Sequence, residues 1–232
     1  MSEGDVIPRF SATERALHWG FGLLYLSLLA TGLPLMFPAL RGWIRGYAPV
    51  VGFRLHLACA ALWIVVTLAV IALGDRRVLG RSWRELTTFG PADAAWLRSF
   101  PRWLVAGAAA RADIDGRVGR FNAGQKLNAL FVAATSGLLL LTGLALVPID
   151  GALPAALVTG AGSVELWRRA HAWLTLLVLL PLAGHVFLAL AFAPTRPSLR
   201  GMLSGAVDRE WAARHYPRWC AAREPDRKDE AA

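Results

Sequence analysis

Four long apolar stretches alternate with polar connections along this chain of 232 residues. The apolar stretches cover about residues 16–37, 52–73, 126–147 and 167–192. Each is close to or above the roughly 20 residues that a helix needs to cross the hydrocarbon of a bilayer. Because backbone polar groups in lipid need partners within their own segment, we expect these stretches to be helices. The pattern therefore predicts an all-α integral membrane protein with a bundle of four transmembrane helices.

The longest polar connection predicts further helices outside the bundle. It covers residues 74–125 and contains amphipathic pieces at about residues 81–86 and 92–104. Pieces of this kind are typical of helices that lie on a membrane surface. Trp96 and Trp103 fall in the second piece, and tryptophan is enriched at the membrane interface. We therefore expect helices on the membrane surface, with Trp96 and Trp103 in the second of them.

The distribution of Lys and Arg predicts the orientation of the chain. Twenty of the 25 basic residues lie in the N-terminal segment, in the long connection together with Lys126 at its end, and in the polar segment that follows residue 195. Connections rich in Lys and Arg stay in the cytoplasm. We therefore expect both termini to be cytoplasmic in a bacterial inner membrane. The predicted organisation is a transmembrane domain over residues 1–195 and a cytoplasmic tail, with short helices of its own, over residues 196–232.

Composition and charge exclude several classes of function. Charged residues are 18% of the chain, below the roughly 25% that is usual in soluble proteins. The formal net charge of +9 could suggest a nucleic-acid partner, but the arginines flank the apolar stretches and no nucleic-acid-binding module is recognisable. We expect a lipid environment and no nucleic acid. The two cysteines, Cys59 and Cys220, form neither a CxxC nor a CxxCH motif, so covalent c-type haem attachment is not predicted.

Four of the five histidines lie inside the apolar stretches. They are His18, His56, His171 and His185. A histidine in hydrocarbon is costly unless its ring nitrogens are satisfied. With the predicted orientation, two of them lie near the outer ends of their helices and two lie in the inner half of the membrane. Histidines at two matched levels favour paired axial ligands of haem iron.

Level matching pairs His56 with His171 on the outer side and His18 with His185 on the inner side. The two histidines of the last stretch are 14 residues apart. At 3.6 residues per turn they lie within roughly 40° of one helix face and about 21 Å apart along the axis. One helix can therefore offer ligands to two stacked cofactors. This arrangement predicts two b haems, each held by two imidazoles and suited to electron transfer.

The same histidines could serve roles other than haem ligation. Any one of them could be a structural histidine bonded to Ser, Thr or a backbone carbonyl, in a cofactor-free membrane anchor. Zinc is a weaker alternative, because no carboxylate or thiolate cluster completes four ligands. A small transporter is disfavoured, because the apolar stretches contain no Asp or Glu for a proton pathway.

A weak internal repeat relates the two halves of the chain. The first stretch contains Leu-Ala-Thr-Gly-Leu at residues 29–33, and the third contains Leu-Leu-Thr-Gly-Leu at residues 140–144. The second and fourth stretches place an arginine two residues before His56 and His171. The repeat predicts two helix pairs of similar design, although Thr-Gly is also common in unrelated transmembrane helices. Pro181 should bend the last helix near His185.

Three polar motifs resemble a known family. They are Arg-Phe-Ser-Ala-Thr-Glu-Arg-Ala-Leu-His-Trp at residues 9–19, Phe-Asn-Ala-Gly-Gln-Lys at residues 121–126, and a tail pattern over residues 200–219 that ends in His-Tyr-Pro-Arg-Trp. Together they resemble the cytochrome b (gamma) subunit of respiratory formate dehydrogenases, a prokaryotic dihaem cytochrome b561-like family. The likeness covers about residues 9–219 and keeps the four membrane histidines in order.

The resemblance implies a membrane-anchoring, quinone-reducing subunit of an oxidoreductase complex. Electrons would come from an iron–sulfur (beta) subunit, itself served by a catalytic (alpha) subunit, and pass through two b haems to a membrane quinone. In this family the quinone pocket adjoins the inner haem ligand and the second motif, which implies Asn122, Gly124 and His185 here. Related subunits serve hydrogenases and other respiratory reductases, so the donor enzyme stays open.

The residues themselves are compatible with a quinone at the start of the third stretch. Asn122 and Gln125 carry amide donors for a quinone oxygen, Gly124 permits close backbone approach, and a helix N-terminus favours negative charge. The alternative is an ordinary helix start, with Asn122 as the cap and Gln125 in the first turn. Lys126 is best interpreted as an anchor at the membrane interface.

Overall fold

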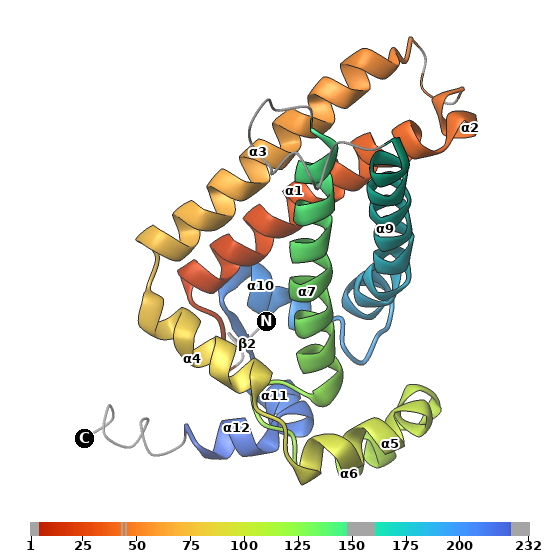
Figure 1. The fold of residues 1–232 in the computed structure, drawn as a ribbon. Helices are drawn as coiled ribbons and strands as arrows, with labels where there is room; N and C mark the ends of the chain where they lie inside the picture. The colour runs from red at the N-terminus through yellow and green to blue at the C-terminus, as the bar shows by residue number, and fades with distance from the viewer. Residues whose placement is uncertain (1–4, 43, 45, 148–160, 224–232) are drawn as a thin grey trace. The chain divides into compact units, whose positions relative to one another are not determined.

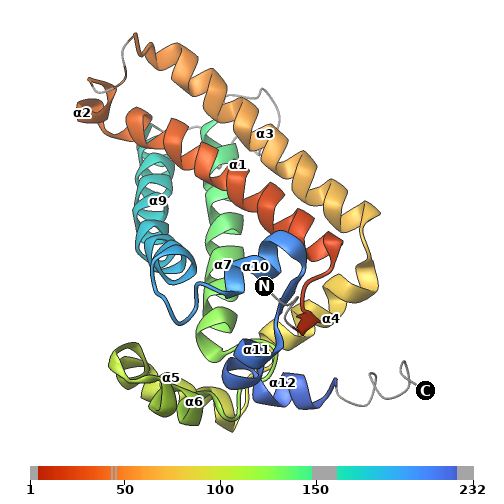
Figure 2. The same cartoon turned by 180° about the vertical axis from the view of Figure 1, so that it is seen from behind.

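The computed structural model describes residues 5–42, 44, 46–147 and 161–223, with no side-chain detail at residues 161 and 162. The chain divides into two compact units, which are described separately. One unit runs from Phe10 to Arg81. The other comprises Met1–Arg9 and Ser82–Ala232. Figures 1 and 2 show the helices of both.

The first unit is a pair of antiparallel helices. Helix α1 (Ala12–Met36) is followed by the short α2 (Pro38–Arg41), and α3 (Pro49–Leu73) lies along α1 in both views (Figures 1 and 2). A capping box starts α1: the Ser11 hydroxyl accepts from the Glu14 backbone N–H, and the Glu14 carboxylate accepts from the Ser11 N–H. The hydroxyl of Thr13 accepts from the Asp75 backbone N–H at 3.1 Å and so ties the end of α3 to the start of α1.

The second unit contains the other long helix pair. Helices α7 (Ala123–Leu146) and α9 (Ala161–Leu190) pack side by side. Helix α9 includes Pro181, whose ring removes one backbone hydrogen bond. The last turns of α9 run in a different direction from its first turns (Figure 1), as the proline predicts.

All four predicted transmembrane helices are confirmed. Helices α1, α3, α7 and α9 are long and apolar enough to cross a membrane. Each begins at least three residues before the predicted apolar boundary. For α1, α3 and α7 the reason is local, because a capping residue or a proline at the helix start extends the helix into sequence that hydropathy alone assigns to the connections.

The long connection and the tail form a second layer of short elements in the second unit. The connection carries α4 (Arg76–Thr87), whose first turns belong to the first unit, then α5 (Pro91–Val105) and α6 (Ala108–Asp115). The tail carries α10 (Ser198–Ser204), β2 (Ala206–Asp208), α11 (Arg209–His215) and α12 (Pro217–Ala221). Strand β1 (Val6–Pro8) pairs antiparallel with β2, with Ile7 opposite Val207. The amphipathic pieces are thus helical as predicted, whereas the sequence pattern does not predict α6 or the strand pair.

These short elements share one hydrophobic core, which we call the cap core. It is built from the N-terminal strand, the long connection, the first turn of α7 and the tail. Its buried members are Ile7, Trp96, Trp103, Val118, Ala123, Val207, Trp211, Ala212, Tyr216, Trp219 and Cys220. The tail therefore packs on the connection between the helix pairs, and a domain boundary at residue 196 stays a prediction.

Two tryptophans of the second amphipathic piece face the interior of the protein. Trp96 and Trp103 are only 4% and 2% exposed, and both lie in the cap core. Their indole N–H groups both donate to the carboxylate of Asp115, at 2.9 and 3.1 Å. A buried indole needs such a partner, so the interior acceptor explains why these side chains face the protein.

Candidate functional site

His56 is held against α1 by a threonine. Its Nδ1 lies 3.0 Å from the Oγ1 of Thr31. The same hydroxyl lies 2.8 Å from the backbone carbonyl of Ser27. A hydroxyl has one proton to donate, and a threonine in a helix commonly gives it to the carbonyl four residues earlier. The Nδ1–H of His56 is then the donor to Thr31.

The residue beside this threonine makes room for the ring. A Cβ at Gly32 would lie 3.0 Å from the Cε1 of His56. Such a distance is too short for an ordinary contact, so a side chain at this position would push the imidazole away from Thr31. The Thr-Gly pair of α1 thus supplies a hydrogen-bond acceptor and the space for the ring together.

The second helix pair repeats the arrangement. His171 of α9 places its Nδ1 2.8 Å from the Oγ1 of Thr142 on α7, and that hydroxyl donates to the Leu138 carbonyl at 2.8 Å. A Cβ at Gly143 would lie 3.4 Å from the Cε1 of His171. The predicted internal repeat is confirmed, because both Thr-Gly pairs hold a histidine of the next long helix in the same way.

This geometry fits the requirements of a haem ligand. A neutral imidazole with its proton on Nδ1 carries its lone pair on Nε2, which is a nitrogen that binds metal. Metal-ligating histidines commonly donate their other N–H to a fixed acceptor, which sets the tautomer and the ring orientation. His56 and His171 both have such an acceptor, so the residues present fit axial ligation of haem iron.

The other two membrane histidines lie on the helices on which the sequence places them. His18 is in the first half of α1, where its ring packs edge-to-face against Trp19 with 5.1 Å between the ring centres. His185 lies four residues after Pro181 on α9 and is exposed on the protein surface. Each predicted ligand pair takes one histidine from each compact unit, so the pairing itself stays a prediction.

The start of α7 is a capping box. The Oδ1 of Asn122 accepts from the Gln125 backbone N–H at 2.9 Å, and the side-chain oxygen of Gln125 accepts from the Asn122 N–H at 3.0 Å. The amide nitrogen of Gln125 donates to the hydroxyl of Tyr216 at 3.2 Å. One of the two N–H groups of the Gln125 amide is therefore committed to Tyr216, and the suggestion that Gln125 offers a donor to a quinone stays a prediction.

Gly124 does permit a close approach, and the partner is a protein side chain. A Cβ at this position would lie 3.2 Å from the Cη2 and Cζ3 atoms of Trp96. The indole that Asp115 anchors thus packs on the first turn of α7. The role of Gly124 at a quinone stays a prediction beside this packing role.

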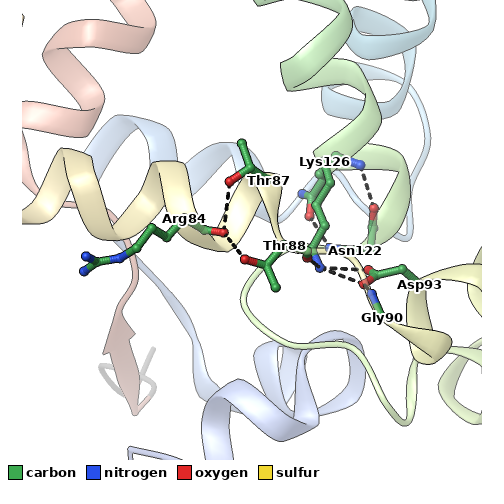
Figure 3. A network of polar contacts seen from close by, with 8 residues as sticks. Arg84, Thr87, Thr88, Gly90, Asp93, Asn122 and Lys126 are labelled. Carbon is green, nitrogen blue, oxygen red and sulfur yellow. Dashed lines mark hydrogen bonds and ion pairs between the residues drawn. The ribbon is translucent and has the colours of Figure 1, made fainter.

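Lys126 is paired within the protein (Figure 3). Its Nζ lies 2.9 Å from the Asp93 carboxylate and donates to the Thr88 carbonyl at 2.8 Å. The lysine and aspartate side chains are only 13% and 14% exposed. The side chain thus joins α7 to α5, and the interpretation of Lys126 as an interfacial anchor stays a prediction.

Two cavities adjoin the start of α7. One, of about 290 Å³, is lined by Trp96, Ala123 and Lys126 among others. The other, of about 350 Å³, is lined by Phe121 and again by Lys126. Space is therefore available next to Asn122, whose neighbours in the chain line both cavities.

Sequence reasoning missed the polar centre of the cap core. Asp115 is 2% exposed and accepts from Trp96, from Trp103 and, at 3.0 Å, from the Nδ1 of His215. The tail motif that contains His215 indicates no such partner. The local sequence does not distinguish Asp115 from Asp113, which lies two residues earlier in the same short polar segment. Asp113 is nevertheless exposed, whereas Asp115 is buried.

Two arginines that indicated topology also have structural partners. The guanidinium of Arg9 donates to the Arg120 carbonyl at 2.9 Å, and that of Arg120 donates to the Arg9 carbonyl at 2.8 Å. Arg9 also stacks on the Tyr216 ring at 3.6 Å, and Arg120 binds the Ser82 hydroxyl. Both are buried, so they join the N-terminal segment to the long connection and the tail.

Comparison with known proteins identifies the family. The profile of the prokaryotic cytochrome b561 family matches residues 9–205, most of the chain. The chain belongs to the prokaryotic cytochrome b561 family. It is therefore a membrane cytochrome b that binds haem b and takes part in electron transfer.

Curated relatives of this cytochrome b extend over nearly the whole chain. The cytochrome b556(Fdn) subunit of the nitrate-inducible formate dehydrogenase of Escherichia coli (strain K12) is 24% identical over 229 residues, which cover 94% of this chain and 92% of the relative. The formate dehydrogenase cytochrome b556(fdo) subunit of the same strain is 25% identical over 225 residues, 94% of each chain. The resemblance that the polar motifs indicated is thus confirmed.

Proposed function

We propose that this cytochrome b is the membrane-anchoring subunit of a formate dehydrogenase-type complex. In this proposal it passes electrons from an iron–sulfur partner through two b haems to a membrane quinone. The observation that carries the proposal is the repeated threonine–histidine hydrogen bond, which prepares His56 and His171 as metal ligands. The likeness to two formate dehydrogenase cytochrome b556 subunits over almost their full lengths supports the choice of complex.

Four histidines would hold the two haems. His56 and His171 are the proposed axial ligands at the outer level, and His18 and His185 those at the inner level. A b haem with two imidazole ligands has no open coordination position and supplies one-electron transfer. The chain supports this chemistry by fixing ring orientation and by surrounding the ligands with apolar helices.

The proposed quinone site is the first turn of α7 together with His185, with Asn122 and Gly124 as the contributing residues of that turn. The capping bond uses the Oδ1 of Asn122, so its amide N–H groups are the donors for a quinone oxygen. The N-terminus of α7 favours negative charge that develops on the quinone. The two cavities beside this turn offer room for a headgroup.

The proposed orientation puts both termini and the quinone site on the cytoplasmic side of a bacterial inner membrane. Basic residues concentrate in the connections on that side. The iron–sulfur (beta) subunit would then dock on the outer side, with the catalytic (alpha) subunit beyond it. Proton uptake from the cytoplasm together with electron delivery from outside makes the reaction electrogenic.

A reduced-minus-oxidised visible spectrum of the purified chain tests the proposal. We expect b-type bands and two haems per chain. His56→Ala and His171→Ala should each remove one haem and the same one, whereas His18→Ala and His185→Ala should remove the other. His215→Gln is the control and should retain both. Absence of b-type bands would favour a cofactor-free anchor, and loss of the same haem in all four alanine variants would refute the pairing.

The donor enzyme needs a separate test, because related subunits serve hydrogenases and other respiratory reductases. Purification of the complex from native membranes, with identification of the partner chains, tests the assignment directly. Formate, and not hydrogen, should reduce the haems of the intact complex. Reduction by hydrogen alone would assign the chain to a hydrogenase and leave its role as an electron carrier in place.

A further inference from the structure

We propose that Thr31 and Thr142 are positioning residues for a single haem, the one that His56 and His171 would share at the outer level. The inference rests on the proposed function, since it takes these histidines as axial ligands of one iron. Each hydroxyl fixes the orientation of one ligand ring and raises the basicity of that ring toward iron.

The geometry gives both threonines the same task. The Nδ1–Oγ1 distances are 3.0 Å for His56 and 2.8 Å for His171. Each threonine hydroxyl also lies 2.8 Å from the carbonyl four residues earlier on its own helix. The hydroxyl proton is therefore directed to that carbonyl, and its oxygen lone pairs accept from the ring N–H.

Each threonine is followed by a glycine that lies against the histidine ring, closely at Gly32 and at ordinary contact distance at Gly143. A Cβ at Gly32 would lie 3.0 Å from the Cε1 of His56, and a Cβ at Gly143 would lie 3.4 Å from the Cε1 of His171. Both helices thus present the same Thr-Gly pair to the ring, with the hydroxyl as acceptor, and at Gly32 the missing side chain also leaves room that the ring needs. The pair occurs on two separate helix pairs, and the histidines it serves are the two that sequence depth assigns to one level.

The expected consequence is a lower reduction potential at that haem. A hydrogen bond from Nδ1–H to an acceptor increases the electron density that the ring donates through Nε2. A stronger donor stabilises ferric iron over ferrous iron, because ferric iron carries the higher charge. Removing either hydroxyl should therefore raise the potential of the haem that the two rings share.

The experiment is a spectroelectrochemical titration of the full-length protein in membranes. Thr31→Val and Thr142→Val should each shift the midpoint potential of one haem in the positive direction, and the same haem should respond to both. The potential of the other haem should not move. The low-spin ferric electron paramagnetic resonance signal of the responding haem should also change, because its ring planes are no longer fixed.

Matched controls separate the hydrogen bond from general packing. Thr31→Ser and Thr142→Ser keep the hydroxyl and should retain the wild-type potential. Thr135→Val removes another buried threonine hydroxyl of α7, one that binds the Phe131 carbonyl at 2.7 Å, and should move neither haem. Where a valine variant does not accumulate, Thr→Cys at the same position keeps the size with a weaker acceptor and should give a smaller positive shift.

The outcomes distinguish this inference from the proposed function. A wild-type chain without b haem would remove the proposed function itself. If the chain binds two haems and neither valine substitution changes their midpoint potentials or their electron paramagnetic resonance signals, only the inference is overturned. Shifts at different haems for the two threonines would overturn it as well, because Thr31 and Thr142 would then serve different irons. Loss of one and the same haem in both valine variants, restored by serine, would support it, since such outer-shell bonds typically contribute roughly 10-fold or more to metal affinity.

Discussion

Hydrogen-bond direction at individual residues decides much of what this cytochrome b can do. At Thr31 and Thr142 the hydroxyl proton is committed to the helix backbone, so the histidine must donate. At Asp115 a buried carboxylate accepts from Trp96, Trp103 and His215. The membrane histidines were predictable because a polar ring in an apolar stretch has a cost. The role of Asp115 was not predictable from the sequence, because its partners lie 12, 19 and 100 residues away along the chain. No local sequence pattern indicates partners at such separations.

Replacing Asp115 with alanine should destabilise the cap core strongly. Removal of the carboxylate leaves two buried indole N–H groups and His215 without their common acceptor, and the loss of one partner from a buried polar network typically costs about 3 kcal/mol. A lower thermal midpoint of the detergent-purified protein, followed by tryptophan fluorescence, is the measurement. Asp113→Ala, two residues away on the same helix and exposed, is the control. Equal midpoints for the two variants would contradict the role of Asp115.

Helix boundaries show what the element scale adds to the hydropathy pattern. The apolar stretches predict the four long helices, but the starts of α1 and α7 depend on the capping boxes at Ser11 and Asn122. Helix α6 escaped prediction because it is eight residues long and has no marked apolar face. The capping interpretation of Asn122 and its proposed role at a quinone are compatible, since the cap uses the amide oxygen and leaves the amide nitrogen as a donor.

Two substitutions at Asn122 should separate these roles. Asn122→Asp keeps a capping oxygen and removes the N–H donors, so stability should hold while quinone turnover falls. Asn122→Ala removes both and should also lower stability by about 1 kcal/mol. Turnover with a quinone analogue and the thermal midpoint are measured for each, together with the haem content, which should stay at the wild-type value. Wild-type quinone turnover in Asn122→Asp would refute the proposed role of Asn122 at the quinone. Its role as the N-cap of α7 would be unaffected.

At the scale of the whole molecule, the cap core gathers segments from distant parts of the chain. Arg9 and Arg120 bind each other's carbonyls, and Arg9 stacks on Tyr216 of the tail. Trp96 connects this core to the first turn of α7, over Gly124. The tail is thus part of the structure that surrounds the proposed quinone site.

Ending the chain at residue 195 should therefore damage more than the tail. The truncation removes Trp211, His215 and Tyr216, so Trp96 and Trp103 lose packing partners and Asp115 loses a donor. We expect faster trypsin cleavage within residues 82–120, where arginines are frequent, while the haem content stays at the wild-type value. A control that ends at residue 223 keeps α10, β2, α11 and α12, the elements that the structure describes in the tail. Equal cleavage rates for the two truncations would support an independent domain over residues 1–195.

The sequence by itself determined the features that depend on local periodicity. Hydropathy set the four membrane helices, the basic residues indicated an orientation, and the repeated Thr-Gly and histidine positions predicted two similar helix pairs. Only the tertiary structure decided which partners the polar side chains bind. It placed Trp96 and Trp103 on Asp115, turned Lys126 toward Asp93, and gave the amide of Gln125 to Tyr216. A polar side chain near a membrane can face lipid, water or protein, and only the positions of distant segments decide which of these it meets.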